Sequence, residues 1–233
     1  MSEEKEFSKG GSQIHRYSEE DFAESWDDLG ESSVEEIDEH ISRFVGEPSF
    51  VLHEVVSPTV HIDVHVVEPT KARNFYTLVT SGMSDKPMKS PFDGLEFAEL
   101  VICLPPSWKV TEDSIHDERY YWPIRQLKYL ARLPHEFNTW LWATHTIPNG
   151  DPPKPYADNT QLCCALLAYP RLFGEGFWML PVQNTKTIHF LSVIPIYAEE
   201  MEFKLNEGVD ALYTRFDQQR TCELLDIARP SVC

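Results

Sequence analysis

Two histidines and an aspartate alternate along one short segment of the chain, in a pattern that could bind a metal ion. His61, Asp63 and His65 are each separated by one apolar residue, so in a strand their side chains lie on the same face. Imidazole and carboxylate groups are ligands of zinc and iron, and a metal held there could serve an enzyme of unknown reaction. The other interpretation is a polar sheet face that hydrogen-bonds to a helix or to water. We favour the polar face, because the segment offers no cysteine and no third firm ligand.

Three basic residues recur three and four positions apart within a helix predicted over residues 119–133. At this spacing Arg125, Lys128 and Arg132 share one face of the helix. One hypothesis is that this face docks an acidic peptide through charge-assisted hydrogen bonds. The alternatives are pairing with acidic residues of the same chain and simple solvation, which is the commonest state of charged helix faces.

Two tryptophans stand just before a loop rich in proline and glycine. Trp140 and Trp142 precede the segment 144–150, which includes His145. An exposed tryptophan in such a place is typical of an interface anchor, and packing in the core is the alternative. Together with the basic helix face, Trp140, Trp142 and His145 form the predicted partner-binding surface.

The chain has 38 acidic and 20 basic side chains, a formal net charge of −18, and the acidity is uneven. Residues 1–48 hold 15 acidic and 4 basic side chains, a net charge of −11, and the remainder carries −7. Direct binding to nucleic acid is disfavoured, because lysine and arginine are the residues that neutralise phosphates. An acidic surface instead attracts basic partners, although acidity can also serve solubility alone.

Targeting signals are absent from the sequence pattern. No apolar run approaches the length of about 20 residues that spans a bilayer, and the acidic N-terminus does not resemble a secretory signal peptide. The number of cysteines is odd and none of them forms a C-x-x-C pair, which favours reduced thiols in a cytoplasmic protein. The five are Cys103, Cys163, Cys164, Cys222 and Cys233.

Predicted strands follow one another along the chain, with helices before, between and after them. Apolar runs and alternation predict strands over residues 50–56, 60–67, 74–80, 97–104, 162–168 and 187–194. Helical spacing predicts helices over 33–45 and 119–133 and a last one capped by Asn206, with Ser33 and Glu36 as a capping box for the first. This order favours an α+β fold, a mixed β-sheet covered by helices.

The acidic N-terminal part differs in composition from the rest. Residues 1–32 are rich in serine and carry only scattered apolar side chains, so we expect a flexible acidic leader that docks in places. Phe22 and Trp26 are four apart and could pack together through a helical turn. Residues 33–233 are expected to form the folded domain.

Four sequence blocks resemble the suppressor of fused family, in the family's order. They run over residues 75–88 (FYTLVTSGMSDKPM), 144–150 (THTIPNG), 193–204 (VIPIYAEEMEFK) and 226–233 (DIARPSVC), so the resemblance covers roughly residues 48–233. It implies a fold like the family's amino-terminal domain. The compact one-domain form is similar to bacterial members.

The resemblance also implies a function class. Animal members are cytoplasmic regulators that grip a peptide of a transcription factor and are not enzymes, and many bacterial members are thought to be immunity proteins that neutralise toxins. By this resemblance the chain is a non-catalytic protein-binding module without a cofactor, and a basic toxin would suit its charge. The alternative from the residues alone is an enzyme or metal-binding protein that uses the face of His61, Asp63 and His65.

Overall fold

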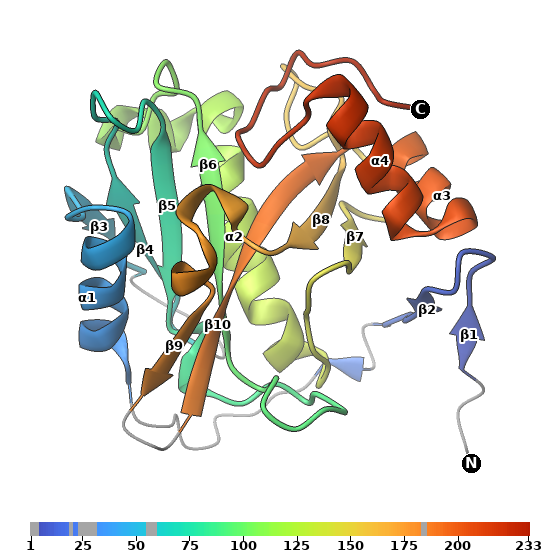
Figure 1. The fold of residues 1–233 in the computed structure, drawn as a ribbon, viewed down its shortest axis with the longest axis horizontal. Coiled ribbons are helices and arrows are strands. Elements are labelled where there is room, and N and C mark those ends of the chain that lie inside the picture. Colours follow the sequence, from blue (N-terminus) through green and yellow to red (C-terminus); the bar gives the residue numbers. More distant parts are fainter. Residues whose placement is uncertain (1–4, 19–20, 23–31, 55–59, 183–185) are drawn as a thin grey trace.

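The computed structural model describes residues 5–18, 21–22, 32–54, 60–182 and 186–233, and it shows one mixed β-sheet with helices on both faces (Figure 1). Seven strands of the described chain lie side by side in the order β3 (Phe50–Leu52), β4 (Asp63–Val67), β5 (Tyr76–Ser81), β6 (Ala98–Leu104), β10 (Lys186–Ile196), β8 (Cys164–Ala168) and β7 (Thr146–Pro148). An eighth strand, β9 (Met179–Val182), pairs with the first half of β10. The predicted α+β class is confirmed.

The centre of the sheet is formed by β6 and β10, which run parallel, whereas the other neighbouring strands are antiparallel. Every residue of β6 is buried, as expected for a strand whose sequence is apolar on both faces. The long strand β10 pairs with β9 through residues 186–189 and with β8 through residues 192–196. Between these two partners, the Phe190 amide bonds to the Trp178 carbonyl.

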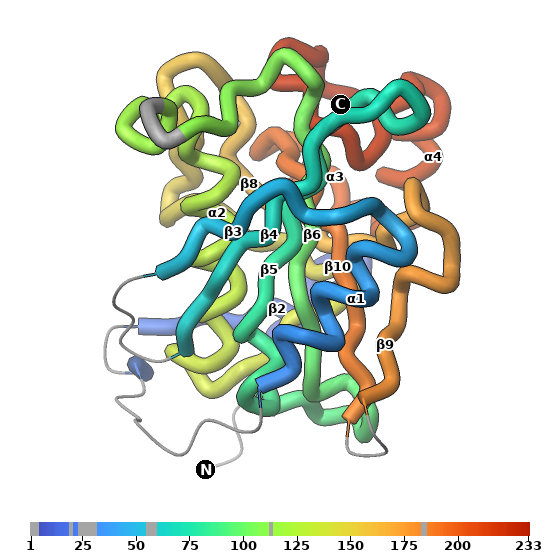
Figure 2. Tube along the Cα trace, turned by 90° about the vertical axis from the view of Figure 1, so that its left-hand side faces the viewer, coloured from blue at the N-terminus to red at the C-terminus, as the bar shows by residue number. Residues whose placement is uncertain are grey.

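Helices cover the sheet unevenly on its two faces. The helix α2 (Glu118–Glu136) packs on one face, and α1 (Val34–Phe44) lies on the other, so the sheet stands between them in Figure 2. The helices α3 (Ala198–Glu207) and α4 (Val209–Gln219) cover the part of the α1 face that is formed by β8 and the end of β10. Side chains that alternate along β4 pack against different helices, because Val64 and Val66 face α2 while His65 and Val67 face α1.

Most predicted elements exist, and the exceptions have local causes. The helix over 33–45 is confirmed as α1, but the capping box is wrong: the Ser33 side chain makes no cap bond. Asn206 does not begin the last helix, because it lies within α3, and Gly208 at φ +89° separates α3 from α4. Strand β7 falls in a stretch expected to be a loop, since Pro148 suits only a strand at the edge of a sheet.

The leader carries a small hairpin of its own, formed by β1 (Glu6–Phe7) and β2 (Gln13–Ile14). In Figure 1 this hairpin lies outside β7, below the corner between α3 and α4, and the Gly10 amide donates to the Leu205 carbonyl there at 2.7 Å. The predicted packing of Phe22 on Trp26 lies outside the described residues. No helix of the described chain is both long and apolar enough to cross a membrane.

Candidate protein-binding surface

The residues predicted as a metal face are held in a hydrogen-bond network around Glu54, beside β4. The Glu54 amide donates to Asp63 Oδ1 at 2.9 Å, and His53 Nδ1 lies 2.8 Å from Asp63 Oδ2. His61 Nε2 donates to the Glu54 carbonyl at 2.8 Å. The Glu54 carboxylate in turn accepts from the Ile62 amide. His61 and Asp63 therefore bond to neighbouring groups of the chain, as the polar-face interpretation expects.

His65 makes its hydrogen bonds with other partners, on the side of the sheet that α1 covers, although Asp63 and His53 are near enough to influence its pKa. Its ring is 2% exposed, with Nδ1 3.2 Å from Asp38 Oδ1 and Nε2 3.0 Å from Ser81 Oγ. Burial lowers the pKa of His65, although the Asp38 carboxylate opposes this shift. Within the part of the chain that the structure describes, no three His, Cys, Asp or Glu side chains converge as metal ligands would. The geometry thus gives the predicted metal site no support.

The basic stripe lies on α2, and two of its three charges bond within the chain. Arg125 Nε donates to Glu118 at 2.7 Å and its Nη2 donates to the Tyr156 carbonyl at 3.0 Å. Arg132 pairs with the Glu54 carboxylate, with side chains 18% and 11% exposed. Burial lowers the pKa of Lys128, and the Glu54 charge opposes that shift. The stripe and the predicted metal face thus meet at Glu54, which supports the intramolecular alternative for these cations.

The segment after α2 gathers aromatic side chains from four other parts of the chain. Trp140 contacts Phe92 and His145, with ring centroids 5.5 and 4.7 Å apart. Trp142 contacts His189 at 4.7 Å and Tyr169 at 6.5 Å, and Tyr169 stacks on Trp178 at 4.9 Å. Met179 follows Trp178 and pairs with His189 across β9 and β10. We name Phe92, Trp140, Trp142, Tyr169, Trp178 and Met179 the aromatic band.

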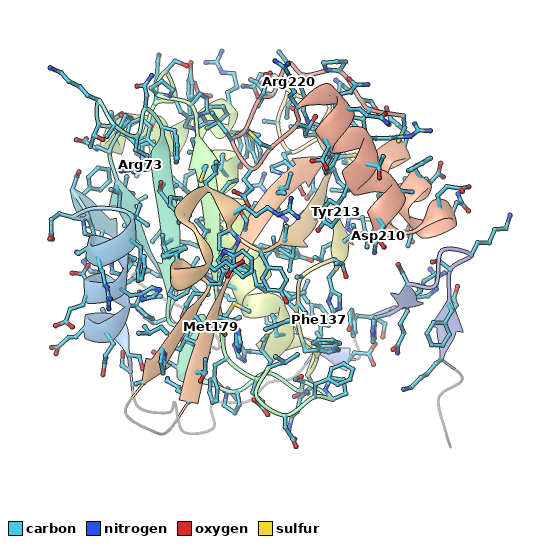
Figure 3. The ribbon with its side chains drawn as sticks, in the orientation of Figure 1. Arg73, Phe137, Met179, Asp210, Tyr213 and Arg220 are labelled. Carbon is cyan, nitrogen blue, oxygen red and sulfur yellow. The ribbon has the colours of Figure 1, made fainter. Side chains whose placement is uncertain are left out.

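The aromatic band is partly open to solvent. Phe92 is 56% exposed, Met179 52% and Tyr169 39%, while both tryptophans of the segment are half-buried. In Figure 3, Met179 and Phe137, which is the residue after α2, are labelled a little below the middle of the view, with Met179 to the left of Phe137. Partly exposed aromatic side chains that contact other rings are typical of a surface that binds a protein.

The histidines that contact the aromatic band carry no charge at neutral pH. Burial lowers the pKa of His145 to about 4 and also lowers that of His189, so both rings are neutral at pH 7. His189 Nε2 donates to the Gly94 carbonyl at 3.0 Å, which ties β10 to the loop that carries Phe92. Exposed residues of both signs flank the band in sequence: Lys89 and Asp93 near Phe92, and Arg171 and Glu175 between Tyr169 and Trp178. The band is thus an apolar strip with charges of both signs beside it.

Of the predicted partner-binding residues, Trp140, Trp142 and His145 lie together in or beside the band. Arg125, Lys128 and Arg132 lie on α2, where Arg125 and Arg132 bond to other groups of the chain. Sequence reasoning missed Phe92, Tyr169, Trp178 and Met179. Their spacing carries no signal, because they reach the band from separate loops and from β9.

The first of the four sequence blocks, around Gly82, is mostly buried. Glu99 has no solvent exposure, and its carboxylate accepts from Thr80 Oγ1 at 2.6 Å, from the Ser84 amide at 2.9 Å and from Ser84 Oγ at 2.7 Å. Gly82 at φ +104° makes the turn that brings Ser84 back to Glu99. This block therefore contributes to the core.

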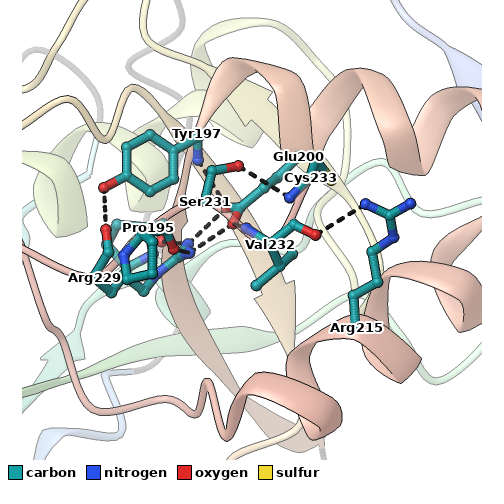
Figure 4. A network of polar contacts seen from close by, with 9 residues as sticks. Pro195, Tyr197, Glu200, Arg215, Arg229, Ser231, Val232 and Cys233 are labelled. Atoms are coloured by element: carbon teal, nitrogen blue, oxygen red, sulfur yellow. Dashed lines mark hydrogen bonds and ion pairs between the residues drawn. The ribbon is translucent and has the colours of Figure 1, made fainter.

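The last two sequence blocks meet in a second buried network (Figure 4). The Glu200 carboxylate accepts from both terminal nitrogens of Arg229 at 2.6 Å, from the Tyr197 amide at 2.9 Å and from the Val232 amide at 3.0 Å. The Tyr197 hydroxyl donates to the Arg229 carbonyl, and Arg215 donates to the Val232 carbonyl at 2.9 Å. These contacts fasten residues 229–233 to α3 and α4.

Comparisons with known proteins agree with this architecture. The family model described as Suppressor of fused protein (SUFU) matches residues 58–230. A suppressor of fused homologue from Neisseria gonorrhoeae has a similar structure, with a TM-score of 0.63 and 20% identity over 85% of this chain and 96% of the other. The Sufu–Fu complex gives a TM-score of 0.61 and 15% identity, over 86% and 92%. Drosophila Suppressor of Fused gives 0.60 and 14%, and there the match spans 86% of this chain but 50% of the other. A comparison with curated proteins gave no match.

Proposed function

The chain belongs to the suppressor of fused family, and from this premise we propose that it is a non-catalytic module that binds a protein partner through the aromatic band. The observation that carries the proposal is the band itself, a partly exposed apolar strip assembled from four separate segments of an otherwise acidic protein. Aromatic side chains on rigid supports supply most of the binding energy in protein interfaces. One structural relative is a Sufu–Fu complex, in which the partner is a protein.

We further propose that the partner is basic and that the chain acts in the cytoplasm as an immunity protein against a toxin. The net charge of −18 supports a basic partner, because opposite charges speed the encounter of two proteins. The five unpaired cysteines are compatible with a reducing compartment. Three of these thiols are buried, so pairing them would disturb the core.

The binding test begins with capture of the tagged chain's partner from a lysate of its source, at low and at high salt. The identified partner is then titrated against Tyr169→Ala and Met179→Ala, and we expect each to weaken the complex about tenfold or more. Tyr129→Ala is the matched control, because Tyr129 is 41% exposed but lies on α2, away from the band. Equal affinities for all three variants would show that the band is not the interface.

The toxin hypothesis is tested separately by expressing the captured partner in a sensitive host. A toxin should arrest growth, co-expression of this chain should restore it, and Tyr169→Ala should restore it less well. A partner without toxicity leaves the binding module standing and refutes the immunity role. Metal analysis of the purified chain, with His61→Ala plus His65→Ala, tests the enzyme or metal alternative: stoichiometric metal that the double variant loses would favour it.

A further inference from the structure

Two aromatic side chains of the leader contact residues that directly precede Trp140 of the aromatic band. Tyr17 donates from its hydroxyl to Thr139 Oγ1 at 2.5 Å, and its ring lies 5.2 Å from the ring of Phe137. Phe22 contacts the same Phe137 ring edge-on at 6.0 Å. Thr139 directly precedes Trp140 of the band. We call Phe137 and Thr139 the leader site.

The path of the leader runs across the edge of the sheet before it reaches this site. Gly10 bonds to Leu205 at the end of α3, and a side chain there would meet the Gly208 amide at 2.5 Å, so the turn fits closely against the helix corner. Further along, His15 is near enough to His145 for its charge to help lower the pKa of that ring, after burial as the main cause. The leader thus passes β7 and His145 on its way to Phe137, as its position in Figure 1 indicates.

The attachment of the leader is slight by comparison with the strands of the sheet. Within the described residues, the leader is held by one backbone hydrogen bond, one hydroxyl hydrogen bond, two ring contacts and the attraction between Arg16 and Asp151. The rings of Tyr17 and Phe22 remain 40% and 42% exposed. Both residues 1–48 and the rest of the chain are acidic, so long-range charge does not hold the leader down. Segments with few buried contacts open most readily.

We propose that residues 5–18 and 21–22 belong to a displaceable strap that covers the leader site, and that a partner segment bearing an aromatic side chain takes its place when the complex forms. The proposal rests on the proposed function, because it extends the partner surface from the aromatic band to Phe137 and Thr139. The chain's own tyrosine and phenylalanine show what the site accepts. A partner must offer an aromatic ring to Phe137 and a hydrogen-bond donor to Thr139, together with contacts to the band.

The probe for this proposal is a labelled synthetic peptide with the sequence of residues 5–22. It is titrated against the full chain and against the full chain carrying Tyr17→Ala plus Phe22→Ala, which loosens the strap and leaves the leader site unchanged. We expect the peptide to bind the double variant about tenfold more tightly, since a tethered leader competes at high effective concentration. Phe7→Ala is the control, because Phe7 is 59% exposed and belongs to the same leader.

Limited trypsin digestion provides a readout that needs no ligand. Cleavage after Lys9 should be about tenfold faster in the double variant than in the wild type and unchanged in Phe7→Ala, because proteolysis follows the population of the open form. Equal peptide affinity for wild type and double variant, or no binding to either, would overturn the strap. Loss of partner binding in Tyr169→Ala with no effect of the double variant would leave the proposed function intact and refute the strap alone.

Discussion

Glu99 and Glu200 are two carboxyl groups without solvent exposure, and they are stabilised in different ways. Glu99 receives only neutral donors, from Thr80 and Ser84, and burial raises its pKa from an ordinary value near 4.5 to about 7. Glu200 receives the guanidinium of Arg229. A buried carboxyl group among neutral donors can keep its proton, whereas the stability of a buried ion pair is lost when either partner is removed.

The Glu99 environment predicts a specific dependence of stability on pH. In the folded chain the carboxyl keeps its proton up to about pH 7, and in the unfolded chain it loses that proton near pH 4.5. The unfolded state therefore binds fewer protons in this interval, and the free energy of unfolding falls as the pH rises, by about 3 kcal/mol in total. Glu99→Gln removes this contribution, so the variant should gain about 3 kcal/mol relative to wild type between pH 4.5 and 7.

The comparison of variant with wild type is needed because several histidines act in the opposite direction. Burial lowers the pKa of five of them, which makes folding more favourable as the pH rises through the same interval. They are His40, His65, His135, His145 and His189. Urea unfolding of both proteins at pH 4.5, 5.5 and 7 measures the difference. A difference that stays constant with pH would contradict the raised pKa of Glu99.

The ion pair of Arg229 predicts a large loss of stability when one partner is removed. The Arg229 side chain is 10% exposed and that of Glu200 is fully buried, so Arg229→Met leaves a buried carboxylate without its cation. We expect the free energy of unfolding to fall by about 3–5 kcal/mol, measured by urea unfolding. Adding Glu200→Gln should recover part of the loss, because the buried charge is then gone.

Arg220→Met is the matched control for Arg229. Both arginines border the same groove of about 790 Å³ at the end of β6, but no side-chain bond of Arg220 occurs among the described residues. We expect its substitution to change the free energy of unfolding by less than about 0.5 kcal/mol. Equal losses for the two variants would show that the pair with Glu200 contributes no special stability.

At the scale of elements, pattern and turn chemistry explain what could be predicted. Helix α1 and the alternating strand β4 follow from apolar spacing, because each has one face against the core. Strands β7 and β9 were missed, since each contains a proline and pairs on one side only. Part of the candidate surface was missed for a different reason: Trp140 and Trp142 are two residues apart in sequence, but Phe92 meets Trp140, and Met179 pairs with His189, only through tertiary structure.

The turn at Gly82 predicts the strongest effect of a single methyl group. A side chain at this position would place its Cβ 1.8 Å from the carbonyl oxygen of His61, which belongs to the backbone beside β4. Gly82→Ala should therefore reduce the free energy of unfolding by about 4 kcal/mol or more, or prevent folding. Thermal unfolding monitored by circular dichroism measures the loss.

The substitution Gly94→Ala is the control that separates the steric clash at Gly82 from the cost of alanine at a positive φ. Gly94 also has a positive φ, +84°, but a Cβ there would meet nothing within 4 Å. We expect Gly94→Ala to cost about 1 kcal/mol, the usual penalty for alanine at such an angle. If Gly82→Ala were no more harmful than Gly94→Ala, the close approach of His61 to the turn would be wrong.

At the scale of the whole molecule, charge and apolar surface have separate roles. The sheet buries its apolar side chains in three clusters against α1, α2 and the pair α3 and α4, and most charged side chains of the described residues stay at least partly exposed. Composition alone gives the net negative charge, and the expectation of a basic partner follows from that charge. It could not predict where the apolar contact surface lies, since the aromatic band depends on how loops meet.

The net charge of −18 predicts how a basic partner associates with this chain. Raising the ionic strength from 0.01 to 1 M shortens the screening length from about 30 to about 3 Å, so the attraction between the two proteins acts only at contact. We expect the association rate constant of the captured partner to fall at least about tenfold in stopped-flow measurements. The dissociation rate should change less, because it depends on the desolvated aromatic band.

The variant Tyr169→Ala should show the reverse, with faster dissociation and an unchanged salt dependence of association. An association rate that is equal at both salt concentrations would mean that the acidity serves solubility and does not select the partner.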